Sequence, residues 1–170
     1  MNFRTLKLGQ NGQFGPRIFM IAGDLRAAEG RRPQLCQHSG MVTHAWSVFV
    51  IDRWDEEVID EHEGAHVVRT AVSKTFSGDI TGTSDGWMTM ARAQRGSMAY
   101  VGFERITATI DGRTGTFVLQ HNAVGNSEGG DATWTVLADS GTGELRGIRG
   151  TAQIARDENG THIFTLNYDL

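Results

Sequence analysis

Hydrophobic and polar positions alternate along most of the chain from Trp46 onward, in segments of strand length. A period of two is typical of strands that bury one face, and these segments are rich in β-branched and aromatic residues. Nowhere does the sequence sustain the apolar period of an amphipathic helix, so we expect very little helix. The expected strands span residues 46–54, 66–76, 79–83, 87–91, 98–110, 114–124, 132–138, 150–155 and 162–169.

Turn residues separate these segments, for example at 84–86 (SDG), 111–112 (DG) and 128–130 (EGG). Short connections of this kind join antiparallel neighbours. The chain has 22 glycines but only two prolines, Pro16 and Pro33, which both precede the expected strands. Proline occurs mainly on sheet edges, and a closed barrel has no edges. We therefore expect an all-β fold, a closed antiparallel barrel of about eight strands that is either filled or holds one small ligand.

Charge divides the chain near residue 40. Residues 1–40 carry six basic and two acidic residues, a net charge of +4, whereas the whole chain has a net charge of −4. We expect residues 1–40 to be a poorly structured N-terminal extension and residues 41–170 to be a single barrel domain.

The acidic body of the chain has no basic stripe, which argues against nucleic acid as a partner. No apolar run is long enough to span a membrane as a helix, and the single cysteine, Cys36, forms no internal disulfide, so we expect a cytoplasmic protein.

One expected hairpin can be given a register. The Asp-Gly pair at 111–112 predicts a two-residue turn, which places Ile110 opposite Arg113. Counting back along both strands makes Glu104 and His121 diagonal neighbours on the more apolar face, which should point inward. The residues that share this face are Tyr100, Gly102, Glu104, Ile106, Ala108, Ile110, Phe117, Leu119, His121 and Ala123. A three-residue turn would instead bring Gln120 to the face of Glu104.

Glu104 and His121 are two ionisable groups on an otherwise apolar wall. A carboxylate in such a cavity must be paired or partly hydrated, and an adjacent histidine shifts its pKa. Such a pair serves either as base and acid in proton transfer, or as a hydrogen-bonded pair that ties two strands together. The aromatic content favours an apolar ligand over a sugar phosphate. The residues expected to line the cavity and bind it are Tyr100, Gln120, Phe117, Trp87, Trp134, Phe164 and Tyr168.

The segment His62-Glu63-Gly64-Ala65-His66 matches the zinc-protease pattern H-E-x-x-H. That chemistry needs both histidines on one helix face, but a glycine interrupts the motif and the second histidine enters an expected strand. We interpret residues 55–64 as an acidic, solvated loop, and we expect neither a metal site nor a cofactor.

Five blocks of the sequence together resemble a bacterial family of domains of unknown function. The blocks are residues 74–84 (KTFSGDITGTS), 100–106 (YVGFERI), 111–121 (DGRTGTFVLQH), 140–150 (SGTGELRGIRG) and 167–170 (NYDL). That family is similar in fold to plant allene oxide cyclase and to dirigent-type barrels. The resemblance implies a small eight-stranded barrel, commonly oligomeric, with a central apolar cavity. The related cyclases shield a reactive substrate and use a buried carboxylate to steer charge. Glu104 and His121 fall within two of the resembling blocks.

These features lead to three hypotheses of function. The first is a cofactor-independent cyclase or isomerase of secondary metabolism, acting on an apolar polyketide or oxidised lipid, with Glu104 as base or charge stabiliser and His121 as acid. The second is a non-catalytic barrel that binds an apolar small molecule. The third is a structural, oligomerising domain with a filled interior. All three exclude nucleic acid and membrane as partners and allow a homo-oligomer.

Overall fold

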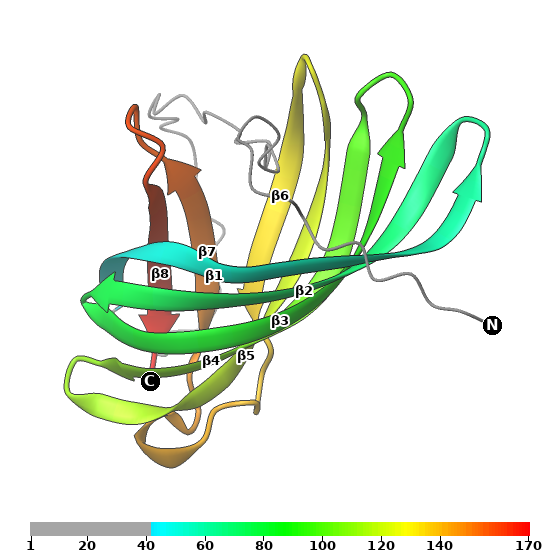
Figure 1. Ribbon diagram of the computed structural model, residues 1–170. Coiled ribbons are helices and arrows are strands. Elements are labelled where there is room, and N and C mark those ends of the chain that lie inside the picture. Colours follow the sequence, from blue (N-terminus) through cyan, green and yellow to red (C-terminus); the bar gives the residue numbers. More distant parts are fainter. Residues whose placement is uncertain (1–41) are drawn as a thin grey trace, which may run out of the picture.

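The structure, a computed structural model, describes residues 42–170, and it contains eight antiparallel strands and one short 3₁₀ turn (Figure 1). The extension expected at residues 1–40 lies outside the described residues. The strands are β1 (Thr43–His62), β2 (Ala65–Gly78), β3 (Ile80–Ala93), β4 (Met98–Ile110), β5 (Arg113–Asn126), β6 (Gly129–Val136), β7 (Arg149–Arg156) and β8 (His162–Asp169), and the 3₁₀ turn is η1 (Gly143–Leu145). Among these residues, no helix is long and apolar enough to cross a membrane.

The eight strands form a closed barrel in which each strand pairs with the next and β8 returns to β1. The closing pair begins where Thr43 lies opposite Tyr168. The β6–β7 seam is the shortest, with only Trp134 opposite Ala152 and Thr135 opposite Thr151. The expected fold class, an all-β closed antiparallel barrel of eight strands, is therefore confirmed.

The alternation seen in the sequence sorts side chains to the two faces of the wall. Along β4, for example, Glu104, Ile106, Ala108 and Ile110 are buried, whereas Phe103, Arg105 and Thr107, which alternate with them, are exposed. The main core cluster fills one end of the interior and includes Leu145 and Ile148, which the connection around η1 contributes. A second, smaller cluster consists of Val68, Val72, Met88 and Met90.

The register predicted for the β4–β5 hairpin is confirmed. Ile110 pairs with Arg113 across a two-residue turn, and Gly102 pairs with His121. The non-glycine residue of the turn, Asp111, has a φ of 50°, as the left-handed conformation of such turns requires. The alternative three-residue turn, which would have turned Gln120 inward, is wrong.

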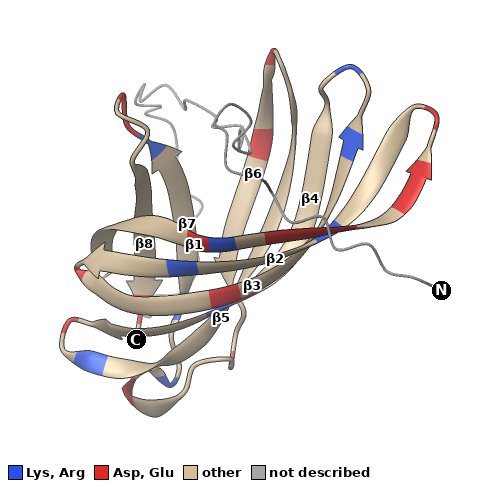
Figure 2. Cartoon of the chain, in the orientation of Figure 1, with Lys and Arg blue, Asp and Glu red and all other residues tan. Residues whose placement is uncertain are grey.

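The interpretation of residues 55–64 as a loop is wrong, because β1 continues to His62 and only the tip at Glu63 and Gly64 is a turn. Two register shifts, between Ile51 and Arg53 and between Val58 and Asp60, interrupt the alternation. Each extra residue shifts the alternation by one position, so that inward-facing positions change from odd to even numbers or from even to odd. Figure 2 shows the acidic positions that run along this part of β1 and its hairpin with β2.

The turn predicted at 84–86 is also wrong, since these residues lie inside the continuous strand β3. Gly86 pairs with Glu104, and a Cβ at Gly86 would lie 3.0 Å from Cγ1 of Val72 and 3.4 Å from Cβ of Glu104. The glycine therefore makes room for two inward side chains and is not part of a turn.

Candidate functional site

A cluster of four polar side chains lies buried in the barrel wall, one from each of four consecutive strands. They are Lys74 (β2), Ser84 (β3), Glu104 (β4) and His121 (β5), and each is at most 5% exposed. The Lys74 ammonium donates to Oε2 of Glu104 at 2.7 Å, and the Ser84 hydroxyl donates to Oε1. Nε2 of His121 lies 2.8 Å from the same Oε2. Both carboxylate oxygens of Glu104 are therefore engaged.

The strand registers bring these four residues to one level of the barrel. Lys74 pairs directly with Ser84, and Gly86 pairs with Glu104 two residues further along β3. Glu104 and His121 are diagonal neighbours on β4 and β5. Because side chains alternate along a strand, all four point to the same inner face.

The charges in the cluster determine its protonation. Burial alone would raise the pKa of Glu104, but the Lys74 ammonium and the nearby His121 outweigh it and hold that pKa well below its usual value. Burial lowers the pKa of His121, and Lys74 adds to this effect while Glu104 opposes it. At neutral pH the cluster therefore holds an ionised Glu104, paired with the Lys74 ammonium, and a neutral imidazole, so that the charges of the ion pair cancel.

The His121 ring is 1% exposed, yet neither of its nitrogens makes a well-aligned hydrogen bond within residues 42–170. Nε2 has the close contact with Glu104, whereas Nδ1 has no polar partner there. A buried polar atom without a partner costs about 1–3 kcal/mol. A hydrogen bond donated to or accepted from this atom would therefore stabilise the barrel.

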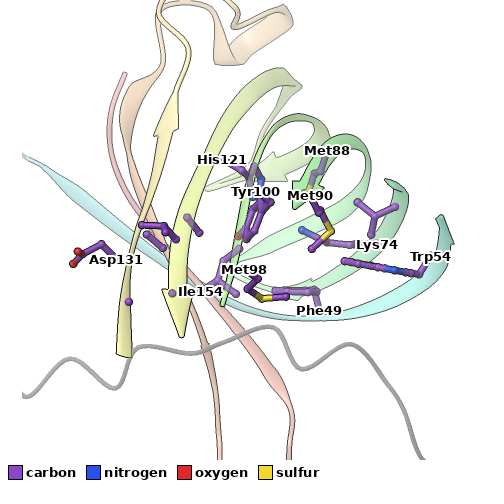
Figure 3. Close-up of a pocket in the computed structure, with 16 residues that line it drawn as sticks. Phe49, Trp54, Lys74, Met88, Met90, Met98, Tyr100, His121, Asp131 and Ile154 are labelled. Atoms are coloured by element: carbon purple, nitrogen blue, oxygen red, sulfur yellow. The ribbon is translucent and has the colours of Figure 1, made fainter. Parts of the chain in front are cut away.

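His121 lines a cavity with a volume of about 50 Å³ (Figure 3). Lys74 and Tyr100 also reach its surface, and the remainder of the wall is mainly apolar and contains three methionines. The lining residues are Phe49, Trp54, Val72, Lys74, Met88, Met90, Met98, Tyr100, His121, Ala123, Val124, Gly125, Gly130, Asp131, Ala132 and Ile154. Val124 and Asp131 are exposed, so the cavity extends from the buried cluster towards solvent.

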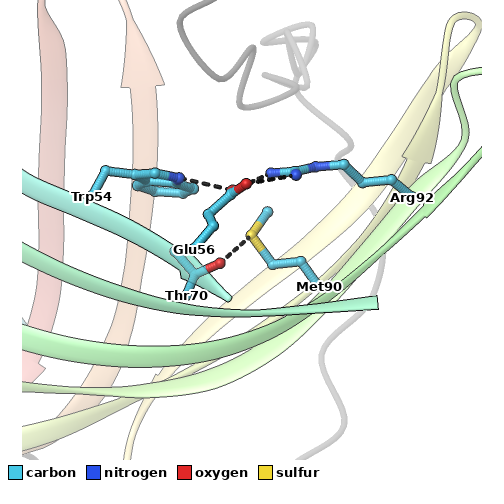
Figure 4. Close-up of polar contacts among 5 residues, drawn as sticks. All are labelled: Trp54, Glu56, Thr70, Met90 and Arg92. Atoms are coloured by element: carbon cyan, nitrogen blue, oxygen red, sulfur yellow. Dashed lines mark hydrogen bonds and ion pairs between the residues drawn. The ribbon is translucent and has the colours of Figure 1, made fainter. Parts of the chain in front are cut away.

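Beside the cavity, an ion pair whose side chains are 25% and 29% exposed joins β3 to β1 across the intervening β2 (Figure 4). Nη1 of Arg92 donates to Oε2 of Glu56 at 2.9 Å, and Nη2 donates to Oε1. The Trp54 indole donates to Oε1 of Glu56 at 2.8 Å, which fixes the ring that lines the cavity. Below this pair, the Thr70 hydroxyl lies 3.3 Å from Sδ of Met90, another lining residue.

The sequence of the barrel matches a known family model over residues 45–168, and the family is described as a protein of unknown function, DUF3224. The chain belongs to the DUF3224 family. A crystal structure of a DUF3224 protein of unknown function from Shewanella oneidensis MR-1 is similar to this chain, with a TM-score of 0.69 and 32% sequence identity. The match covers 75% of this chain and 96% of that one. A search of curated proteins finds no match.

In this DUF3224 barrel, three of the residues predicted for the site lie together. Glu104 and His121 are in contact, and Tyr100 lies beside them with its ring centroid 6.3 Å from that of His121. Tyr100 and His121 line the cavity, whereas Glu104 lies behind His121 in the wall.

The other predicted lining residues do not reach the cavity. Phe117, Phe164 and Tyr168 point inward but pack in the main core cluster, and Trp134 packs against that cluster. Placing Trp87 and Gln120 on the cavity wall was wrong, because both lie on the outer face of the DUF3224 barrel, where Trp87 is 55% exposed. Trp87 pairs with the equally exposed Phe103, so its ring covers the outside of the wall.

Lys74 and Ser84 are not among the residues that the sequence pattern predicts for the site. Lys74 was detectable, because Val68, Thr70, Val72 and Phe76 alternate with it on the buried face of one strand. A lysine in phase with four buried residues indicates a buried charge that needs a partner. Ser84 was hidden by the turn-like composition of its neighbours.

The H-E-x-x-H segment forms the tip of the β1–β2 hairpin, with Ala65 opposite His62. The His62 side chain is 81% exposed and contacts Asp60. Residues 42–170 contain no group of three histidine, cysteine or acidic side chains arranged to hold a metal. The segment has neither the helix nor the ligand set of a zinc protease.

Proposed function

We propose that the barrel binds a small, largely apolar molecule in the cavity beside His121. The observation that carries this proposal is the imidazole itself, which is fully buried, lies on the cavity wall and has no hydrogen-bond partner at Nδ1 within the described residues. Small-molecule sites are typically apolar clefts with a few polar groups that orient the ligand. Phe49, Met88 and Met90 supply the apolar surface, and His121 supplies the polar contact.

The cavity volume limits how the ligand enters. At about 50 Å³ the space is about a third of the roughly 150 Å³ in which an engineered apolar cavity of another protein binds benzene. The buried space therefore accepts one end of a ligand, whose remainder lies towards Trp54 and Asp131. Methionine side chains are flexible and can repack around a larger body, which suits the wall formed by Met88 and Met98.

The test of this proposal compares two phenylalanine substitutions at adjacent positions of β5. Ala123→Phe places a ring in the cavity, whereas Asn122→Phe places the same ring on the outer face. Native mass spectrometry of protein purified from its own host is expected to show one small molecule on the wild type and on Asn122→Phe, and none on Ala123→Phe. An equal amount on all three folded proteins, or no molecule on any, would refute binding in the cavity and favour a structural role.

A second proposal is catalysis by the same site, as a cyclase or isomerase. The resemblance to allene oxide cyclase and dirigent-type barrels suggests it, and the neutral imidazole of His121, whose Nδ1 has no partner within residues 42–170, supports it. In an isomerisation, Nδ1 of His121 would take a proton from one atom of the substrate and return it to another, so that no co-reactant is needed. Glu104 would position the imidazole and stabilise the imidazolium, because its own oxygens already have partners.

Turnover separates the two proposals once a bound molecule has been identified. Catalysis predicts that the bound molecule is converted by wild-type protein and that His121→Ala lowers the rate at least about a hundredfold, in line with the usual contribution of a general base. Glu104→Gln is expected to lower the rate as well. Saturable binding of a ligand that is recovered unchanged after long incubation would refute catalysis and leave the binding proposal intact.

Cytoplasmic location, a homo-oligomeric state and the exclusion of nucleic acid and membranes stay predictions from sequence.

A further inference from the structure

We infer that the ligand group which meets His121 is an uncharged hydrogen-bond donor, such as a hydroxyl group, on an apolar body. The inference rests on the proposed binding function and deepens it, because it specifies the chemistry of the buried end of the ligand. It follows from the tautomer that the neighbours of His121 impose.

The position of the imidazole proton is determined by Glu104. Oε2 of Glu104 accepts a hydrogen bond from the Lys74 ammonium at 2.7 Å and also lies 2.8 Å from Nε2 of His121. An ionised carboxylate has no proton to donate, so this close contact, although not aligned as a hydrogen bond, favours the tautomer with its proton on Nε2. A neutral imidazole carries one N–H, and Nδ1 is then an acceptor with a free lone pair.

The protonation states around the ring support this assignment. Lys74 and Ser84 both donate to Glu104 and hold it ionised, and burial lowers the pKa of His121. Tyr100, the remaining titratable group beside the ring, has its pKa raised by burial and is neutral. An acceptor at Nδ1 therefore persists at neutral pH.

Desolvation disfavours charged groups on the ligand, because the charges of the buried Lys74–Glu104 pair cancel and leave no net charge to compensate them. A carboxylate on the ligand would meet the lone pair of Nδ1 and the charge of Glu104 behind it, and Lys74 is already paired. An ammonium would be repelled by Lys74 and would lose its hydration in a mainly apolar cavity. A hydroxyl group donates one hydrogen bond at little desolvation cost, and the thioethers of Met88 and Met90 favour an aromatic ring behind it.

Three probes that share a para-substituted toluene ring test the inference by titration calorimetry: para-cresol, its methyl ether para-methylanisole, and para-toluate. The wild-type protein is expected to bind para-cresol about tenfold more tightly than the ether, which corresponds to one hydrogen bond, and to bind para-toluate more weakly still. In His121→Phe, para-cresol and the ether should bind equally. In the matched control His62→Phe, at an exposed site, the tenfold preference should persist.

The outcomes distinguish this inference from the proposed function. If para-toluate or the ether binds as tightly as para-cresol, the preference for a hydrogen-bond donor is refuted. The proposal that the cavity binds apolar molecules would still stand. If none of the three probes binds, both the proposed function for this class of ligand and the preference for a hydrogen-bond donor are refuted.

If His121→Phe does not fold, the position of the imidazole proton can be measured on the wild-type protein. Nitrogen NMR of the histidine side chains at neutral pH should show His121 with its proton on Nε2 and an unprotonated Nδ1. Addition of para-cresol should shift the Nδ1 resonance in the direction of a hydrogen-bonded nitrogen. A proton on Nδ1 in the free protein would overturn the inference.

Discussion

Glu104 organises its surroundings through three contacts. Its carboxylate accepts from the Lys74 ammonium and from the Ser84 hydroxyl, and it lies against Nε2 of His121. A carboxylate held in this way has a depressed pKa and is a poor base at neutral pH. The expectation that Glu104 itself removes a proton from a substrate is therefore less favoured than a role in which it holds the imidazole in one tautomer.

The buried ion pair predicts a large loss of stability when one member is removed. Glu104→Gln leaves the Lys74 ammonium, which is 5% exposed, without its counter-charge, and we expect the free energy of unfolding to fall by about 3–5 kcal/mol. Urea denaturation measures this change. Lys74→Met in the same background should restore part of the stability, because the uncompensated charge is gone.

An exposed ion pair provides the matched control. Glu57 accepts from Arg69 at 3.2 Å on the surface, and both side chains are more than half exposed. Glu57→Gln should therefore change the free energy of unfolding by no more than about 1 kcal/mol. A similar effect of the two glutamate substitutions would contradict the assigned importance of the buried pair.

At the scale of the strands, small residues determine how closely β3, β4 and β5 approach beside the site. Gly102 pairs with Met88 on one side and with His121 on the other. A Cβ at Gly102 would lie 2.4 Å from the carbonyl oxygen of Trp87 and 2.7 Å from Cγ of Met88. Both distances are shorter than real Cβ contacts, so the strands or the cavity wall would have to move.

We therefore predict that Gly102→Ala destabilises the barrel by about 1–3 kcal/mol, the usual cost of overpacking, and weakens ligand binding by shifting Met88 and His121. Thermal unfolding and para-cresol titration measure the two effects. Gly125→Ala in β5 is the control for stability only, because Gly125 also lines the cavity; a Cβ there would lie no closer than 3.2 Å to any residue other than its two chain neighbours. Equal stability of the two variants would argue against the close approach.

The sequence predicts the β4–β5 hairpin well and the second half of β1 poorly, for a physical reason. In the hairpin, one Asp-Gly turn defines the register, and uninterrupted alternation carries it to Glu104 and His121. In β1, two register shifts change the inward parity, and the strand extends beyond the core, so that Glu56 and its neighbours read as a solvated loop. The ion pair between Glu56 and Arg92, which are 36 residues apart, depends on which side chains of β1 point inward after these register shifts, and the sequence pattern does not show this.

Much of the candidate site could be predicted in the same local way, and the remainder could not. Glu104, His121 and Tyr100 follow from one hairpin, but their partner Ser84 depends on recognising that Gly86 is a space-making residue inside a strand. The cavity wall contains Met88, Met90 and Met98, which a single strand pattern does not distinguish from core. Barrel curvature decides which inward residues meet, and alternation alone carries no information on it.

At the scale of the whole molecule, the depressed pKa values of buried groups make stability depend on pH. His121 and His162 both have pKa values below the usual 6.5 because burial disfavours their charged forms. As pH falls through about 6.5, the unfolded chain takes up protons that the folded barrel does not, so the free energy of unfolding decreases. The depressed pKa values of Glu104 and Glu56 extend this loss below about pH 4.5.

We predict that the urea midpoint is highest near neutral pH and falls in two stages, first as the pH drops below about 6.5 and again below about 4.5. His162→Gln should reduce the first stage, and His121→Phe should reduce it if the variant folds. The exposed His62→Gln should leave the curve unchanged. A midpoint that stays constant between about pH 7 and 5 would contradict the burial of neutral histidines.

The closing pair of β1 and β8 gives the barrel a cyclic order. Every strand hydrogen-bonds to its neighbours in sequence, and β8 lies beside β1, so the eight strands form a ring in which no strand is first. A circular permutant that joins residue 170 to residue 42 through a short linker and opens the turn between Ala93 and Met98 would keep every strand pair. In that chain β8 and β1 would form a local hairpin. The β3–β4 pair, which contains the buried Glu104, would then join the two ends of the chain.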